Sequence, residues 1–233
     1  MSYPVDPHAR WVLVYRWIVF LLAAGFALRQ LVFSADYSDP GGPFRYLTIW
    51  ALMLSFFSAS RMLALTERRS TRDWPELVAV TAVLNALVVL VYWRLWFEDP
   101  ALVNSGGPLP WWLDYYLHGL GPLLQWIDAL FIRGGFRRPL RAVPWLLGLT
   151  LLYVTWAEAF VGRFNDTPVG LVTDGLPYPF LNSMEFAERL MFYATTGATG
   201  LGFLALFSAV AWALRRFLQE GRQGRSDSQD KEA

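Results

Sequence analysis

The chain has 233 residues, of which 55% are apolar, 17% are aromatic and only 17% are charged, and its formal net charge is +1. It contains no cysteine, which excludes a disulfide framework, a thiolate nucleophile and a thiolate metal site. The near-neutral charge gives no general case for a nucleic-acid partner, whereas so apolar a composition is typical of a protein that crosses a bilayer.

Six apolar stretches are long enough to cross a bilayer as helices, each of which needs roughly 20 mostly apolar residues. In chain order they cover residues 11–33, 46–65, 77–97, 111–132, 143–161 and 186–217. The sequence therefore predicts an all-α, polytopic membrane protein with one six-helix domain over residues 1–218. Residues 219–233 are polar and charged, so we expect a disordered cytoplasmic tail there.

The basic residues of the loops predict how the chain is oriented. They gather before the first stretch, in alternate loops and after the last stretch, at Arg10, Arg68, Arg69, Arg72, Arg133, Arg137, Arg138, Arg141, Arg215, Arg216, Arg222, Arg225 and Lys231. The loops on the other side hold only Arg45 and Arg163. Because short loops rich in Lys and Arg stay in the cytoplasm, we expect both termini inside.

His118 is one of two histidines and the only one within an apolar stretch. An ionisable group inside a bilayer is costly, so such a residue is a functional-site hypothesis by default. With the predicted orientation, His118 lies about 10 Å below the outer boundary of the membrane, and Thr48 lies about one turn below it. A histidine that only packs between helices is an equally open interpretation of His118 at this point.

Asp114 precedes His118 by one helical turn and can hold one ring nitrogen, which leaves the other nitrogen free to act as a base. Several further polar residues fall near the outer surface, which predicts a polar pocket open to, or just beneath, the outer leaflet. The competing interpretation is that long charged side chains near helix ends simply reach the interface. The cytoplasmic half holds fewer polar residues, mainly Arg16, Ser58, Arg61 and Asp128, and its arginines can also extend to the interface.

Two common kinds of hydrolytic site are poorly supported by the sequence. Zinc sites draw on several histidines or cysteines, and neither an H-x-x-x-H nor an H-E-x-x-H spacing occurs. A metal cluster of His118 with Glu158, Glu185 or Glu188 stays open. A serine nucleophile in a G-x-S-x-G turn is absent from the sequence.

Three segments resemble the FAR-17a/androgen-induced-gene family of integral membrane proteins and its bacterial relatives. They are residues 44–50 (FRYLTIW), 117–122 (LHGLGP) and 176–181 (LPYPFL). Characterised animal members are threonine hydrolases of lipid esters, notably fatty acid esters of hydroxy fatty acids. The resemblance implies that Thr48 is the nucleophile and His118 its partner, that no cofactor takes part, and that the protein lies in a bacterial cytoplasmic membrane.

We therefore predict an intramembrane lipid-ester hydrolase with its active site toward the outer leaflet. Thr48 and His118 would be catalytic and Asp114 would orient the histidine. Arg94, Asn182 or a backbone amide near Gly119 or Gly121 would be the oxyanion donors, with Glu185 as a further supporting residue. The alternative is a non-enzymatic transporter, channel or lipid-binding membrane protein. A transport path should carry polar residues through the middle of the membrane, whereas polar residues thin out below His118 in the sequence. Asn85 near the middle of the third stretch and the Thr195-Thr196-Gly197 segment of the last one keep this alternative open.

Overall fold

The computed structural model describes residues 5–103, 109–133, 135–165 and 175–229. Within these ranges every regular element is a helix, which confirms the predicted all-α fold class. Five helical runs are long and apolar enough to cross a bilayer, namely Arg10–Phe33, Leu47–Thr66, Pro75–Glu98, Pro139–Phe164 and Phe186–Phe217. The chain is therefore a multi-pass integral membrane protein.

The long helices begin and end within a few residues of the predicted stretches, apart from the last. Their bounds are α1 (Arg10–Leu28), which ends in a π-helical turn at Arg29–Phe33, α2 (Leu47–Thr66), α3 (Pro75–Glu98), α6 (Pro139–Trp156) and α9 (Phe186–Gln229). α6 continues through a π-helical segment, Ala157–Val161, into the short α7 (Gly162–Phe164). Pro75 and Pro139 take the first helical position, where the missing N–H loses no hydrogen bond.

The fourth predicted stretch forms a continuous run of short helical segments instead of one regular α-helix. The segments are α4 (Trp111–Tyr115), a π-helical segment at Tyr116–Leu120, α5 (Gly121–Ile127) and a second π-helical segment at Asp128–Ile132. The Gly121 N–H donates to the Tyr116 carbonyl and closes the first π turn. A Cβ atom on Gly121 would lie 2.9 Å from that carbonyl oxygen, so the close approach requires glycine.

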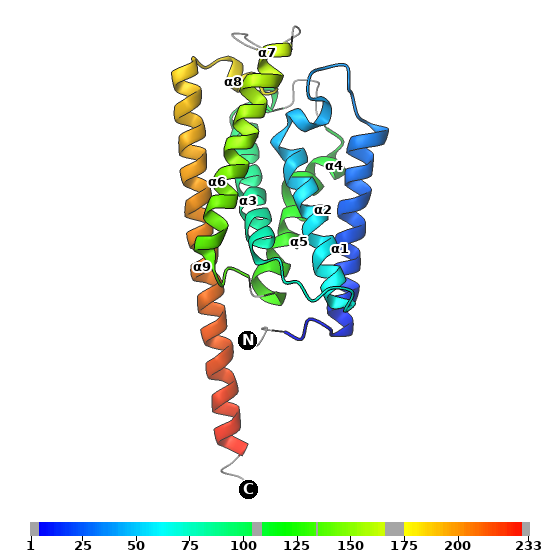
Figure 1. Cartoon of the computed structure of the whole chain (residues 1–233), viewed down its shortest axis with the longest axis vertical. Coiled ribbons are helices and arrows are strands. Elements are labelled where there is room, and N and C mark those ends of the chain that lie inside the picture. Colours follow the sequence, from blue (N-terminus) through cyan, green and yellow to red (C-terminus); the bar gives the residue numbers. More distant parts are fainter. Residues whose placement is uncertain (1–4, 104–108, 134, 166–174, 230–233) are drawn as a thin grey trace.

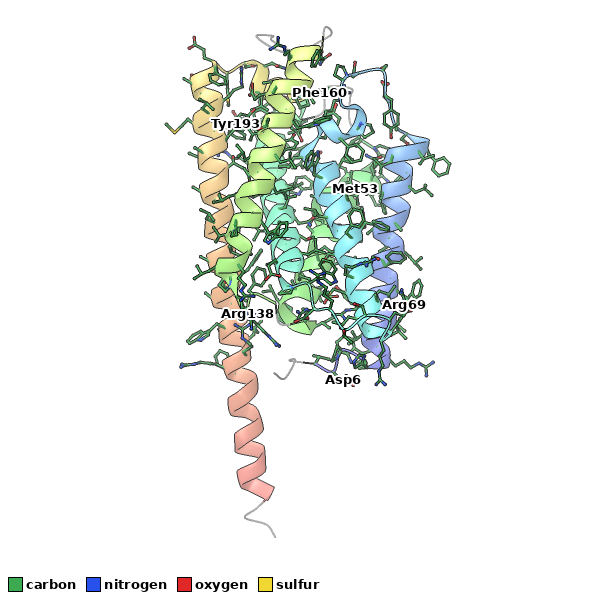
Figure 2. The ribbon with its side chains drawn as sticks, in the orientation of Figure 1. Asp6, Met53, Arg69, Arg138, Phe160 and Tyr193 are labelled. Carbon is green, nitrogen blue, oxygen red and sulfur yellow. The ribbon has the colours of Figure 1, made fainter. Side chains whose placement is uncertain are left out.

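α3 is the central helix of the bundle, because it packs against α2, α5, α6 and α9. Figure 1 shows α1 and α2 on one side of it and α6 and α9 on the other. Both termini lie at the same end, which we call the terminal end, and α2 and α4 begin at the opposite end, which we call the loop end. Figure 2 places Arg69 and Arg138 near the terminal end and Phe160 and Tyr193 near the loop end.

Apolar packing against α1 and α2 holds the π-helical segment that follows α4. Leu52 of α2 is buried in one cluster with Leu113 and Leu117. Phe26 of α1 stacks on Tyr116, with ring centroids 3.6 Å apart and ring planes 6° apart. Aromatic pairs contribute about 0.5–1.5 kcal/mol beyond the area they bury. This packing therefore fixes the position of the π-helical segment, Tyr116–Leu120, against α1 and α2.

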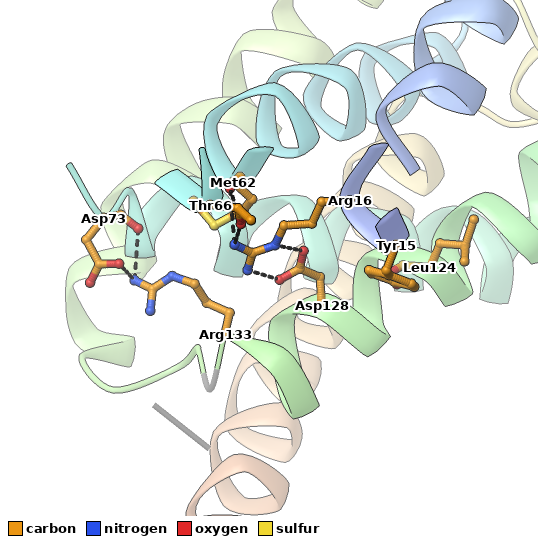
Figure 3. Close-up of polar contacts among 8 residues, drawn as sticks. All are labelled: Tyr15, Arg16, Met62, Thr66, Asp73, Leu124, Asp128 and Arg133. Carbon is orange, nitrogen blue, oxygen red and sulfur yellow. Dashed lines mark hydrogen bonds and ion pairs between the residues drawn. The ribbon is translucent and has the colours of Figure 1, made fainter. Parts of the chain in front are cut away.

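Arg16 forms a buried ion pair near the terminal end (Figure 3). Its Nε and Nη2 atoms donate to the two carboxylate oxygens of Asp128 at 2.9 and 2.8 Å, and Nη1 donates to Thr66 Oγ1 and the Met62 carbonyl. Its side chain is 1% exposed, so the expectation that it extends to the interface is wrong. The buried carboxylate explains this, because a paired charge can stay inside the protein. Arg61 does lie exposed.

α9 continues beyond the apolar stretch, through Gln229 and into the segment for which the sequence predicts disorder. Extending an existing helix needs only one further hydrogen bond per residue, without a new nucleation step. The division of the chain into a membrane domain at residues 1–218 and a tail at 219–233 stays a prediction.

Candidate active site

Thr48 lies in the first turn of α2, where the chain enters the bundle from the loop end. A 3-10 turn at Gly42–Arg45 and the extended residue Tyr46 precede the helix. The first N–H groups of a helix have no partner within it, and the Leu47 N–H donates to the Tyr178 hydroxyl at 2.9 Å. The Thr48 N–H makes no hydrogen bond to any residue in the described ranges. A free backbone donor thus stands beside the Thr48 hydroxyl.

The structure brings Thr48 and His118 into contact from separate helical segments. Thr48 Oγ1 lies 3.3 Å from His118 Nε2. The imidazole is buried, with 3% of its residue surface exposed, and Thr48 is half-buried. A distance of this size is typical of a nucleophile and its base before a substrate binds.

Asp114 holds the other ring nitrogen of His118, as its one-turn spacing predicts. His118 Nδ1 lies 2.8 Å from Asp114 Oδ1. An ionised carboxylate can only accept hydrogen bonds, so the proton of the neutral imidazole sits on Nδ1. His118 Nε2 is then an acceptor, and the Thr48 hydroxyl donates to it. The three side chains therefore form a threonine–histidine–aspartate relay with the tautomer that general-base chemistry needs.

Two aromatic residues of α3 fix the imidazole further. The Tyr92 ring lies parallel to the His118 ring, with centroids 3.4 Å apart and planes 2° apart. The Tyr92 hydroxyl is hydrogen-bonded to the Asp114 carboxylate. Trp93 Nε1 donates to the His118 carbonyl at 2.7 Å. The histidine is thus held through one face of its ring, through Nδ1 and through its backbone.

Two tyrosine hydroxyls lie beside the threonine. The Tyr178 hydroxyl accepts from the Leu47 N–H and lies beside the Thr48 and Tyr153 hydroxyls. The Tyr153 hydroxyl donates to the Arg45 carbonyl at 3.0 Å. Burial raises the pKa of Tyr178 to about 12, so its hydroxyl keeps its proton at neutral pH.

Thr48 opens onto an apolar cavity between α2, α3, α6, α8 (Pro179–Asn182) and α9. It encloses about 840 Å³ of space, its open side included. Its walls are mostly aliphatic and aromatic, and their polar groups are mainly hydroxyls, among them those of Thr48, Tyr153 and Tyr178. We call this space the apolar cavity. It suits a hydrocarbon chain whose polar end lies at Thr48.

A smaller cavity, with room for about one water molecule, lies on another side of Thr48. It is lined by residues of α2, α3 and the fourth helical run, namely Thr48, Ala51, Leu52, Ser55, Asn85, Tyr116, Leu117, Gly121 and Pro122. We call it the polar cavity because Ser55 and Asn85 meet in it. Gln125 also joins them by donating to the Ser55 carbonyl, so three polar residues come together below His118.

The remaining predicted supporting residues do not reach Thr48. Arg94 is exposed on α3 and lines neither cavity. The amide group of Asn182 is committed to the Leu176 backbone, where it accepts from the N–H and donates to the carbonyl, each at 2.9 Å. Glu185 is exposed, and its N–H donates to the Glu188 side chain in the first turn of α9. Asn182 instead supports the loop that carries Tyr178.

The metal interpretation finds no support in the part of the chain that the structure describes. No group of three or more His, Cys, Asp or Glu side chains comes together there. Glu158 pairs with Arg189 at 3.0 Å and accepts from the Tyr193 hydroxyl at 2.7 Å. This cluster joins α9 to the π-helical end of α6, beside the apolar cavity.

Sequence reasoning missed Tyr92 and Tyr153 as members of the site. Both lie inside apolar stretches, where tyrosines commonly pack in the protein interior or lie at the membrane interface. The one available signal is position, because each lies near the loop end of its helix, at the depth predicted for the histidine.

These features define a polytopic α-helical membrane protein with a threonine–histidine–aspartate relay, centred on a buried histidine, beside an apolar cavity. A family model described as FAR-17a/AIG1-like protein matches residues 12–211. The chain belongs to the FAR-17a/AIG1-like family, and the resemblance noted in the sequence is thereby confirmed. No curated protein and no solved structure matches the chain.

Proposed function

We propose that the protein is an intramembrane hydrolase of lipid esters of the fatty acid ester of hydroxy fatty acid type. The observation that carries this proposal is the contact of 3.3 Å between Thr48 Oγ1 and His118 Nε2, with Asp114 on the opposite ring nitrogen. A threonine hydroxyl becomes a useful nucleophile only when a base removes its proton. The relay supplies that base and fixes its tautomer.

The reaction proceeds through an acyl-enzyme. His118 Nε2 takes the proton of the Thr48 hydroxyl while Oγ1 attacks the carbonyl carbon of the ester. The tetrahedral intermediate collapses, the bond to the alkoxy oxygen breaks, and His118 returns the proton to the leaving alcohol. Water then attacks the Thr48 ester by the same route and releases the fatty acid.

The negative charge on the carbonyl oxygen needs donors beside Thr48. The Thr48 N–H is free within the described structure, and it lies at a helix start, where the helix dipole favours negative charge. The Tyr178 hydroxyl lies beside the Thr48 side chain, and its one hydrogen can turn to the carbonyl oxygen of a bound ester. We assign these two groups as the oxyanion donors in place of Arg94 and Asn182. One such donor is worth about 10²–10³ in kcat in a well-studied hydrolase.

The apolar cavity supports a lipid substrate. Thr48 lies at its loop end, while Leu84, Leu149 and Thr196 lie farther along it toward the middle of the bundle. A chain bound there places its carbonyl group at the hydroxyl and its methyl end among aliphatic side chains. No cofactor is required for this chemistry. The loop-end position also agrees with an active site toward the outer leaflet, if the arginine-rich terminal end lies in the cytoplasm.

A transporter or channel is the second candidate, and the cluster of Ser55, Asn85 and Gln125 in the middle of the bundle favours it. A path to the terminal end would continue past Asp128. That carboxylate is held by two hydrogen bonds from Arg16, and both side chains are buried. A fixed, neutralised pair serves structure better than it serves the passage of a proton or an ion.

Labelling with a fluorophosphonate tests the proposal. The purified wild-type protein should take the label at Thr48, as located by mass spectrometry of the modified peptide. The Thr48→Ala protein should take none, and His118→Ala should take it far more slowly. Thr199→Ala, which alters an exposed threonine of α9, should label normally. Full ester hydrolysis by the Thr48→Ala protein would rule out the assigned nucleophile.

A further inference from the structure

The polar cavity contains two hydrogen-bonding groups that the protein itself does not satisfy. Ser55 follows Thr48 by seven residues on α2, so it lies about 10 Å deeper in the bundle. Asn85 faces it from α3. Both residues are buried, at 5% and 3% exposure. A buried polar group left without a partner is costly, so two of them in one cavity need an explanation.

The amide orientation of Asn85 follows from its neighbours. Its Nδ2 atom lies 2.8 Å from the Thr81 carbonyl, which can only accept. The nitrogen must therefore be on that side, and it also donates to Ser55 Oγ at 2.9 Å. Both amide hydrogens are then used, and the carbonyl oxygen Oδ1 is left over. Within the described residues, Asn85 Oδ1 receives no hydrogen bond.

Ser55 is left with the complementary group. Its Oγ accepts from Asn85, so its own hydrogen is free to donate. That hydrogen finds no acceptor among the described residues, although a buried serine in a helix usually donates to the carbonyl one turn before it. The cavity thus presents one donor, Ser55 Oγ–H, and one acceptor, Asn85 Oδ1. Buried water needs two to four polar partners, and this pair supplies the first two.

We propose that the polar cavity binds water and supplies it to the acyl-enzyme at Thr48. This inference rests on the proposed threonine hydrolase and adds the second substrate of the reaction to it. Thr48 lines both cavities. An acyl chain in the apolar cavity leaves the polar cavity free, so water can approach the ester from a side that the chain does not fill.

The step that this water performs is deacylation. Its oxygen attacks the carbonyl carbon of the Thr48 ester, and its proton passes to His118 Nε2. The bond between that carbon and Thr48 Oγ1 then breaks, and the proton on Nε2 passes to Oγ1. The free fatty acid and the original hydroxyl result. Acylation uses no water, so the polar cavity should affect only the second half of the reaction.

Two variants separate the halves of the reaction. Ser55→Ala removes the donor with little change of volume, and Asn85→Leu removes the acceptor with a side chain of similar shape. Labelling of Thr48 by a fluorophosphonate should be unchanged in both. Steady-state hydrolysis of a para-nitrophenyl ester of a fatty acid should fall about tenfold, as expected when a hydrogen bond that holds water in the polar cavity is lost. A burst of para-nitrophenol should precede the slow phase, and intact-mass spectra should show acylated Thr48.

Ser58→Ala provides the matched control, because Ser58 is a buried serine one turn further along α2 that lines neither cavity. It should show wild-type turnover. Normal labelling together with unchanged turnover in Ser55→Ala and Asn85→Leu would overturn the water site and leave the nucleophile intact. A wild-type protein that never takes the label would instead overturn the threonine hydrolase itself. Slower labelling in Ser55→Ala would assign Ser55 to acylation and contradict the inference.

Discussion

The ring of Tyr92 lies flat against the imidazole of His118, with 3.4 Å between their centroids. The same tyrosine is hydrogen-bonded through its hydroxyl to Asp114, which holds His118 Nδ1. One side chain of α3 therefore supports two members of the relay. It limits rotation of the imidazole by stacking and limits movement of the carboxylate by a hydrogen bond.

Substitution of Tyr92 should separate these two effects. Tyr92→Phe keeps the stacked ring and loses the hydrogen bond, so kcat for a para-nitrophenyl ester should fall about tenfold. Tyr92→Leu loses both contacts, and kcat should fall about a hundredfold. Steady-state kinetics of the purified variants measure the two losses. Equal kcat values for Tyr92→Leu and the wild type would refute a supporting role.

Asp114→Asn should lower kcat by about 10²–10⁴ through the tautomer of His118. The amide nitrogen can donate to Nδ1, which favours an imidazole with its proton on Nε2. Such a ring cannot accept the Thr48 proton. Asp99→Asn is the control, because Asp99 lies outside the site and caps a short turn through the Ala101 N–H. If both substitutions had the same small effect on kcat, Asp114 would not orient the base.

Tyr178→Phe should lower kcat by about tenfold to a hundredfold and leave KM nearly unchanged, because an oxyanion donor acts mainly in the transition state. Since the pKa of Tyr178 is raised to about 12, its hydroxyl is fully protonated, and able to donate, at every pH well below that value. The loss should therefore be constant between mildly acidic and mildly alkaline pH. Tyr37→Phe, in an exposed loop tyrosine, should have no effect. A change in KM alone would assign Tyr178 to substrate binding.

Gly121→Ala should destabilise the protein by about 1–3 kcal/mol, because the new methyl group meets the Tyr116 carbonyl oxygen at 2.9 Å. Gly119→Ala is the matched control in the same helical run, since a Cβ atom there meets nothing within 4 Å. That change should be neutral or stabilising, because alanine favours a helix more than glycine does. Thermal unfolding in detergent compares the two. A stable Gly121→Ala protein would show that the π turn can relax at little cost.

Thr196→Trp should shorten the acyl chain that the protein accepts. Thr196 lines the apolar cavity about 15 Å along α9 from its loop end, and an indole there would fill the space for the far part of a chain. Rates of labelling by short-chain and long-chain fluorophosphonates measure the effect, and only the long-chain rate should fall. Thr199→Trp places the same group on the exposed side of α9. Identical chain-length profiles for the two variants would mean that the acyl chain binds elsewhere.

Hydropathy was sufficient to place the long helices, because in lipid each backbone N–H and C=O must be hydrogen-bonded within the chain, and this requirement outweighs the helix propensities of single residues. Depth along the helices also placed Thr48, Asp114 and His118 within about two turns of one another. The contact between Asp114 and His118 could also be predicted, because residues one turn apart share a helical face however the helix packs in the bundle.

Depth alone does not give the direction in which a side chain points. Arg94 and Tyr92 differ in depth by only two residues, yet they differ by about 200° around the axis of α3. Tyr92 therefore faces His118, whereas Arg94 is exposed. The polar groups of Ser55 and Asn85 likewise meet only because α2 and α3 are neighbours. Tertiary packing decides which helices are neighbours and how each helix is rotated about its axis, and these cannot be predicted from any one stretch of sequence.

The ion pair of Arg16 and Asp128 has a consequence for how the protein assembles. The two residues are 112 positions apart in the chain, so the first helix leaves the ribosome long before its partner carboxylate exists. During that interval α1 carries an unmatched guanidinium in an otherwise apolar segment. α1 can already pack against α2 and bond to Met62 and Thr66 through Nη1, but its positive charge gains a carboxylate only after the fourth helical run has inserted. The order of synthesis thus makes neutralisation of the Arg16 charge a late event, governed by a residue near the middle of the chain.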